Sequence, residues 1–339
     1  MEVGLFHSVQ WPESSTQAQR YQESMAQAVV ADELGFDSVW LTEHHFSRHG
    51  IVSDSLAVLA NLAARTERVR LGTAVSVLPL HDPLRLAESA ATVDLLSGGR
   101  LDLGVGRGYQ AGEFSGFGVD MAEKAERFDE ALEVLCTAWS STQPFDHEGT
   151  YFRYEQAAPQ PRPIQEPHVP IWVATDSASG LAQCARGDFG VLLPQGTSLD
   201  VVAAQVGRYR DALEAAGRPQ QARRVYLARA AHVAASDEQA WSEAEGPYQS
   251  FLSYADKLRR GTAAEGTVRG YSPFDLNADL RSSALFGSPD SVIAGLTKIH
   301  SVGVDRVMLF VHMAELPHEK ILSSLELFAR EVLPAVHEL

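Results

Sequence analysis

An apolar run near residue 40 ends in three residues that can carry acid–base chemistry. Residues 36–42 are mostly apolar, and Glu43, His44 and His45 follow them directly. An imidazole exchanges protons near neutral pH, and a neighbouring carboxylate can orient it. We therefore interpret all three as candidate catalytic residues. By strand parity, His44 shares a face with Trp40 and should point inward. For His45, a purely structural hydrogen bond is an equally good interpretation.

Other apolar runs also end in ionisable residues. His7, Arg107, Asp176, His232 and His312 lie at or just beyond the ends of such runs. A single histidine in such a place is usually a structural residue. Several strand ends that converge on one rim favour a shared site, which is the arrangement we predict.

Two segments have the composition of an anion-binding site. Gly104–Gly108 surrounds Arg107 with small residues, and its guanidinium can hold a phosphate through paired hydrogen bonds. Asp176, Ser177 and Ser179 lie where a predicted helix begins, with free backbone N–H groups and two hydroxyls. We predict a phosphate bound by both segments. A salt-bridged arginine and a simple helix cap are the alternatives. The glycine pattern fits neither a Walker A loop nor a dinucleotide fingerprint.

Strands and helices that would position these residues alternate along the chain. Eight apolar runs have the character of buried parallel strands, at 3–7, 38–43, 69–77, 100–106, 170–175, 189–194, 224–233 and 305–311. Segments of helical period follow at 17–34, 54–64, 83–96, 122–139, 177–186, 199–216, 289–301 and 317–336. This alternation predicts a (β/α)8 TIM barrel, in which active sites lie at the C-terminal ends of the strands. A doubly wound sheet is the alternative.

The 339 residues exceed the roughly 250 that such a barrel needs. The surplus falls at 109–169 and 247–287, where we expect inserted loops at the C-terminal face acting as lids or binding loops. We interpret residues 1–339 as a single barrel domain.

Composition excludes some function classes. The net charge of −16 argues against binding to nucleic acid or to an anionic membrane. Cys136 and Cys184 lie in helical patterns and are interpreted as buried thiols of a cytoplasmic protein. We find no leader or membrane-spanning pattern. His45 and His49 have a metal-ligand spacing but lie in a loop, so we expect no metal; metal-dependent hydrolysis stays open as an alternative.

Five segments together carry a family resemblance. They read GFDSVWLTEHHF at 35–46, GTAVSVLP at 72–79, SGGRL at 97–101, GVGRG at 104–108 and DSAS at 176–179. The chain resembles the bacterial luciferase-like, flavin-dependent monooxygenase family over essentially its full length. The resemblance implies a (β/α)8 barrel that binds reduced FMN (FMNH2). In this family the flavin reacts with O2 to give a C4a-peroxyflavin, which oxygenates an organic substrate.

Residue roles follow from the resemblance by position. His44 matches the catalytic histidine, while Arg107, Ser177 and the backbone near Asp176 match contacts to the flavin phosphate. Ala74 and Val75 match a non-proline cis peptide bond under the flavin ring, which backbone energetics alone would not suggest. Gly106, Tyr109 and Ser179 complete the candidate cofactor site. Candidates to line an apolar mouth are Phe6, Trp40, Phe46 and Leu78.

Some features of the sequence differ from the luciferase catalytic chain. Gly106 stands where that chain has a reactive cysteine, and Gly180 stands near an aligned threonine. The segment that matches the mobile lid, 271–287, looks shorter. These differences argue against light emission and against a preference for long-chain aldehydes, but not against activation of O2.

The sequence also supports expectations about binding partners and alternative functions. We expect a small organic substrate, O2, a separate flavin reductase and, by resemblance, a homodimer formed through 54–64 and 83–96. The reductase is expected because the chain has no NAD(P)H fingerprint of its own. Hydride transfer with a deazaflavin coenzyme is the alternative function, and a non-catalytic flavin-binding or partner subunit is a third.

Overall fold

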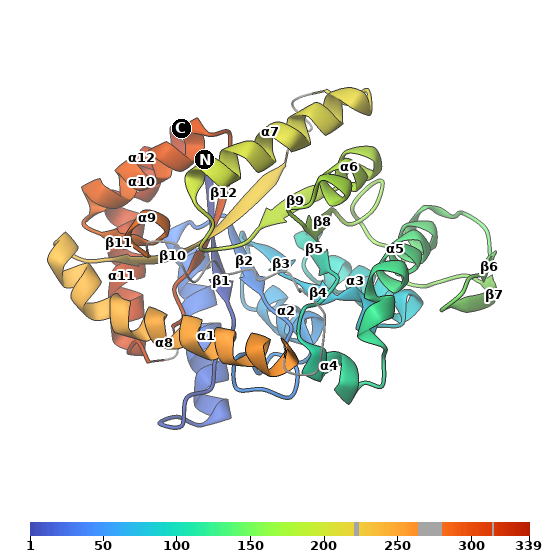
Figure 1. Ribbon diagram of the computed structural model, residues 1–339, viewed down its shortest axis with the longest axis horizontal. Coiled ribbons are helices and arrows are strands. Elements are labelled where there is room, and N and C mark those ends of the chain that lie inside the picture. Colours follow the sequence, from blue (N-terminus) through green and yellow to red (C-terminus); the bar gives the residue numbers. More distant parts are fainter. Residues whose placement is uncertain (220–223, 264–279, 314) are drawn as a thin grey trace.

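Parallel strands form a closed barrel at the centre of the molecule, with helices around it (Figure 1). The structure is a computed structural model and describes residues 1–219, 224–263, 280–313 and 315–339. The strands of the barrel are β1 (Glu2–His7), β2 (Ser38–Leu41), β3 (Arg70–Thr73) extended by β4 (Ser76–Val77), β5 (Leu101–Gly106), β8 (Ile171–Ala174), β9 (Gly190–Leu193), β10 (Val225–Val233) and β12 (Arg306–Phe310). Because β12 pairs with β1 and β9 with β10, the sheet closes. The predicted barrel is confirmed, and the doubly wound alternative is wrong.

Helices follow the strands much as the sequence periodicity indicates. They are α1 (Gln17–Leu34), α2 (Ser55–Ala63), α3 (Pro83–Leu96), α5 (Lys124–Ser140), α6 (Ala178–Gly187), α7 (Leu199–Ala215), α10 (Pro289–Ser301), α11 (His318–Glu331) and α12 (Leu333–His337). Their ends have ordinary chemical causes. The Asp82 carboxylate accepts from the backbone N–H of Arg85 and caps α3, which begins at Pro83. Gly35 ends α1 with φ +88°, a conformation that glycine adopts readily.

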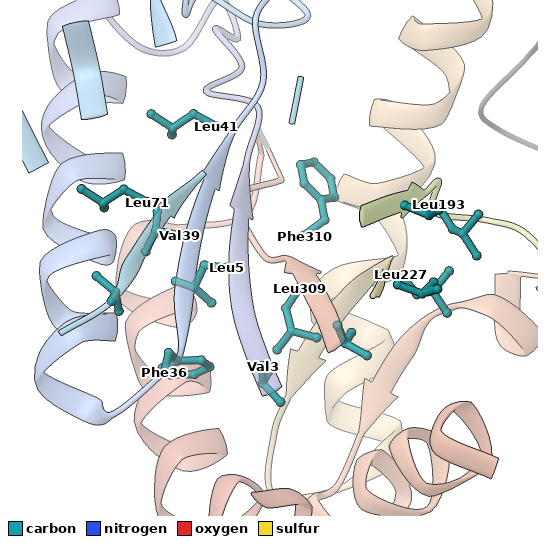
Figure 2. Close-up of a cluster of buried hydrophobic side chains, with 14 of the residues drawn as sticks. Val3, Leu5, Phe36, Val39, Leu41, Leu71, Leu193, Leu227, Leu309 and Phe310 are labelled. Carbon is teal, nitrogen blue, oxygen red and sulfur yellow. The ribbon is translucent and has the colours of Figure 1, made fainter. Parts of the chain in front are cut away.

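Alternate residues of each strand serve two different cores. Leu5, Val39 and Leu71 are in register across β1, β2 and β3 and belong to the large apolar cluster between barrel and helices (Figure 2). Trp40 has the opposite parity and packs inside the barrel against Trp172 and the other members of a second cluster. The barrel interior is therefore filled with side chains below its C-terminal mouth.

Elements that the strand–helix pattern did not predict occur mainly in the two expected inserts. The first insert contains α4 (Ala111–Gly116), the short 3-10 helix η2 (Met121–Glu123) and an antiparallel hairpin of β6 (Phe145–Glu148) and β7 (Arg153–Ala157). The second contains most of α8 (Asp237–Ala263), then α9 (Leu280–Ser283) and β11 (Leu285–Gly287). Another 3-10 helix, η1 (Leu78–Leu80), precedes α3. Most of the segment compared with the lid, 271–287, lies outside the described residues.

Two composition-based expectations can be compared with the structure. Cys136 and Cys184 are free thiols, half-buried and buried respectively, which confirms that they are not paired in a disulfide. None of the helices in the described ranges has the length and apolar character that a membrane-spanning helix needs.

Candidate active site

A cavity of about 420 Å³ lies at the C-terminal ends of the barrel strands. It is lined by residues that end or follow β1, β2, β3, β4, β5, β8 and β9, together with side chains of β10, α8 and β12. Nine of the predicted site residues line it, namely Glu43, His44, Ala74, Val75, Gly106, Arg107, Tyr109, Asp176 and Ser177. The other two, His45 and Ser179, do not.

His44 is held by two side chains that come from the first insert. Its Nδ1 lies 3.0 Å from Glu113 Oε1 and 2.9 Å from the Gln110 amide nitrogen. A carboxylate can only accept a hydrogen bond, so His44 Nδ1 carries a proton and donates a hydrogen bond to Glu113 Oε1. The Gln110 side chain is compatible with this proton when its amide group is turned so that the oxygen, rather than the nitrogen, faces Nδ1. His44 and Glu113 are both buried. The opposite ring nitrogen, Nε2, is then the one that can accept a proton.

Sequence reasoning missed Glu113. It lies in the short helix α4, far along the chain from His44, and no motif marks it. Its Oε1 also accepts from the backbone N–H of His45 at 3.0 Å. One buried carboxylate therefore fixes both the catalytic candidate and the backbone that follows it.

Glu43 is a buried anion between two other histidines. Its Oε1 lies 3.2 Å from His45 Nε2 and 2.8 Å from His81 Nε2. Burial alone would raise the pKa of Glu43, but the hydrogen bonds from His45 and His81 outweigh it and lower this pKa to about 2. Burial lowers the pKa of His81, and the bond to Glu43 more than offsets this, so that it is raised. These contacts favour the structural interpretation of His45.

His49 lines the cavity beside His44, with 5.1 Å between the ring centroids. Burial, and then the proximity of His44, hold its pKa well below the usual value, so the ring is neutral at pH 7. Its Nδ1 is buried and has no hydrogen-bond partner. Across the part of the chain that the structure describes, no three His, Cys, Asp or Glu side chains group as metal ligands.

Two cations lie on another side of the cavity. The guanidinium of Arg107 is 3.5 Å from Asp129 Oδ1, and its Nε is buried without a partner. Lys124 donates to the carbonyl oxygen of Gly108 at 3.3 Å. Burial, and then repulsion by Arg107, lower the pKa of Lys124. Both residues line the cavity, and sequence reasoning missed Lys124.

The start of α6 adds hydroxyl groups to this side. Ser177 caps the helix, because its Oγ accepts from the backbone N–H of Gly180 at 3.2 Å. Thr175 Oγ1 lies 3.3 Å from Ser177 Oγ. A Cβ placed on Gly180 would come within 2.0 Å of Thr175 Oγ1. The Thr175 hydroxyl therefore occupies the space next to residue 180, near which the luciferase catalytic chain has an aligned threonine.

The Ala74–Val75 peptide bond is cis, as predicted. Both residues are partly exposed and line the cavity. A Cβ on Gly106 would lie 2.6 Å from Val75 Cγ2, so the absence of a side chain at 106 leaves room for Val75. The cis bond and Gly106 thus form one continuous part of the cavity wall.

Three histidines do not join the site, contrary to prediction. His7 and His312 are fully buried outside the cavity, with rings 5.6 Å apart, and the Arg20 guanidinium contacts His312. His232 pairs with Glu243 at 2.9 Å. His7 follows Phe6, which faces the cavity, so alternation along β1 turns His7 outward.

The predicted apolar lining was correct only for Phe6. Trp40 belongs to the cluster inside the barrel, and Leu78 belongs to the outer core. Phe46 is 69% exposed, and its ring lies 5.1 Å from that of Phe117. These three predictions are wrong because apolar character alone does not determine whether a residue faces the cavity.

Comparisons with known proteins agree with this arrangement. A profile described as luciferase-like monooxygenase matches residues 1–306. The crystal structure of monooxygenase RslO1 from Streptomyces bottropensis superposes with a TM-score of 0.89 at 31% identity, covering 100% of both chains. The oxygenase component of a flavin-dependent trigonelline monooxygenase from Acinetobacter baylyi is 27% identical over 100% of this chain and 96% of its own. An F420-dependent glucose-6-phosphate dehydrogenase from Kineococcus radiotolerans is 35% identical over 56% of this chain and 58% of its own.

Proposed function

Because this chain belongs to the luciferase-like monooxygenase family, we propose that it is a flavin-dependent monooxygenase that uses reduced FMN and O2 to oxygenate a small organic substrate. One observation carries the proposal. A single cavity combines a buried imidazole whose Nε2 can accept a proton, at His44, with a pair of cations, Arg107 and Lys124, that suits a phosphate. The cis bond Ala74–Val75 lines the same cavity.

Several features of the cavity fit FMN. The unpartnered Arg107 Nε and the neighbouring Lys124 would hold the phosphate, and the hydroxyls of Thr175 and Ser177 would add hydrogen bonds. A dianion there would relieve the repulsion between the two cations. The small side chain of Ala74 on the cavity wall leaves room for a flat ring system beside the backbone. When bound, reduced FMN supplies two electrons and the C4a atom at which O2 is activated.

We assign proton transfer to His44. With its Nδ1 proton directed to Glu113, its Nε2 can take a proton from a substrate or return one to oxygen. The carboxylate would stabilise the imidazolium that forms during such a transfer. Glu43 and His45 would act less directly, by fixing the backbone on either side of His44.

The remaining walls favour exclusion of water. Phe6, Leu192, Phe251 and Met308 line the cavity with apolar surface. Fewer water molecules near the reacting atoms would limit the unproductive reduction of O2 to hydrogen peroxide. We do not assign light emission to the chain.

We propose that a separate reductase supplies the reduced flavin. The trigonelline relative is named as an oxygenase component, which supports a two-component system. The homodimer through α2 and α3 stays a prediction. Two leucines near the end of α3, Leu95 and Leu96, are exposed and available for such a contact.

Hydride transfer with a deazaflavin coenzyme is the second candidate. The similarity to the dehydrogenase from Kineococcus radiotolerans favours it, since that relative is named for its dependence on F420. A phosphate-bearing deazaflavin would use the same two cations, Arg107 and Lys124. If the protein transfers hydride, His44 would donate a proton to the substrate that is being reduced. When the reaction runs in the reverse direction, His44 would accept a proton from the substrate.

An anaerobic binding titration separates the two candidates. Reduced FMN and a reduced deazaflavin are added to separate samples, and riboflavin serves as the matched ligand without a phosphate. We expect micromolar or tighter binding of reduced FMN, and binding of riboflavin that is at least about tenfold weaker because it lacks the charged contacts. Preferential binding of the deazaflavin would overturn the proposal in favour of the second candidate. Binding of neither would leave the interpretation as a non-catalytic partner subunit.

A further inference from the structure

Ring side chains line one side of the cavity. The rings of His49 and Phe251 are nearly parallel, with 5.0 Å between centroids and 21° between planes. The His44 and His49 ring centroids are 5.1 Å apart. Phe6 completes this wall, because its ring and that of Phe251 both contact Phe310. We call Phe6, His44, His49 and Phe251 the ring wall.

The β1 end of the ring wall lies across the barrel from the strands that carry Arg107 and Ser177. Its members come from the end of β1, the residues after β2, and α8. Arg107 follows β5 and Ser177 follows β8, and in the strand order of the barrel β5 and β8 are opposite β12 and β1. With a flavin phosphate on the cation side, the ring wall is left for the other reactant.

Two buried polar atoms on this side have no hydrogen-bond partner. They are His49 Nδ1 and Thr42 Oγ1, and both residues line the cavity. A buried polar atom without a partner costs free energy, so a ligand that supplies one gains affinity. A neutral imidazole and a hydroxyl can each be satisfied by a group that both donates and accepts.

Charge near the ring wall disfavours an anion. Glu113 lies next to His44 and lines the cavity. Among the described residues that line the cavity, the Lys and Arg side chains are Arg107 and Lys124, which follow β5 in the chain. A carboxylate or sulfonate placed against the ring wall would lose hydration without gaining a cation.

We propose that the ring wall binds the organic substrate, and that this substrate is a flat aromatic ring carrying a hydroxyl or similar donor–acceptor group and no negative charge. The aromatic ring would stack on the wall. The polar group would reach His49 or Thr42, which also brings it close to the proton-transfer candidate His44. The inference rests on the proposed function, because it assigns the phosphate side of the cavity to the flavin.

Four probes of matched size test each part of this substrate class. They are 2-naphthol, naphthalene, 2-naphthoate and 2-decalol, titrated into protein loaded with oxidised FMN, with the flavin absorption spectrum as readout. We expect 2-naphthol to bind most tightly. Decalol should bind about fivefold to tenfold more weakly for lack of stacking. Naphthalene should bind more weakly by a similar factor for lack of the hydrogen bond. Naphthoate should bind at least about 100-fold more weakly, as an unpaired buried anion.

Two variants should each remove one preference and keep the other. His49→Phe keeps the ring and removes the polar atom, so the preference for naphthol over naphthalene should fall to within about twofold. Phe251→Leu keeps apolar volume and removes the aromatic ring, so the preference for naphthol over decalol should fall instead. Because each readout is a ratio within one variant, a general loss of stability would not imitate it.

The outcomes are separable. Normal FMN binding, together with naphthoate or decalol binding as tightly as naphthol, would overturn the substrate class and leave the proposed function intact. Variants that keep both preferences would overturn the assignment to the ring wall. Absence of binding of both oxidised and reduced FMN would overturn the proposed function and this inference with it.

Discussion

Replacement of Glu113 by Gln tests how His44 is controlled. The substitution conserves shape and removes the negative charge next to His44 Nδ1. We expect it to lower kcat strongly while FMN binding changes little, because Glu113 contacts His44 and the backbone of His45 rather than the cation side of the cavity.

The magnitude follows from the contacts. Glu113 Oε1 accepts two hydrogen bonds, each of 3.0 Å, from His44 Nδ1 and His45 N. Bonds to a buried charged group contribute about 1.5–3 kcal/mol each, so the amide should cost roughly 1–3 kcal/mol of folding stability. Loss of the charge that stabilises an imidazolium should add about 2–4 kcal/mol to the reaction barrier, which is about 30-fold to 1,000-fold in kcat.

The assay compares wild type, Glu113→Gln and Glu113→Asp with the aromatic substrate that wild type turns over fastest. The Asp variant keeps the charge and should recover part of kcat. Glu126→Gln is the matched control, because Glu126 is a carboxylate that bonds to Tyr151 Oη and does not line the cavity. FMN affinity and thermal unfolding are measured on the same samples.

One result would refute this reasoning. If Glu113→Gln folds, binds FMN and turns over substrate within about threefold of wild type, the carboxylate does not control the proton of His44. A rise in KM at constant kcat would instead assign Glu113 to substrate binding.

Three further predictions concern the other walls of the site. Arg107→Ala should weaken FMN binding about tenfold to 100-fold while riboflavin binding stays within about twofold, as measured by flavin fluorescence. Gly106→Val should weaken FMN and riboflavin equally, because its Cβ would displace Val75, 2.6 Å away; selective loss of FMN alone would contradict this. The pKa of Glu43 is lowered from 4.5 to about 2 in the folded protein, so its contribution of roughly 3 kcal/mol should be present above pH 4.5 and be lost as the pH falls toward 2. Urea unfolding of Glu43→Gln should therefore depend less on pH across that interval, and an unchanged profile would argue against a buried anion.

The sequence predicted the barrel well because each strand is buried on both sides and each helix has a clear period. α1, α3 and α10 begin and end at the predicted residues. α8 was missed because Pro247 interrupts its pattern. Fully buried strands and helices with one buried face thus leave a signal in the sequence that an irregular insert does not.

The site could be predicted only in part. His44 and Glu43 follow a recognisable strand, whereas Glu113 and His81 reach them from segments that no local pattern connects to β2. Strand parity correctly predicted that His44 points into the cavity. The same rule, applied to His7, would have excluded His7 from the site. Contacts between distant segments are fixed by packing, which periodicity within a single segment does not encode.

The reaction of the reduced complex with O2 tests the central claim most directly. Protein loaded anaerobically with reduced FMN is mixed with O2, and oxygen uptake and the return of oxidised flavin absorbance are followed in parallel. The proposed function predicts that one O2 is consumed per bound flavin before the oxidised spectrum returns, and that His44→Ala still takes up O2 but transfers little oxygen to substrate. Two results would contradict it. One is a bound flavin that does not consume O2. The other is an oxidised flavin spectrum that returns at the same time as O2 is taken up, as it does for free FMN.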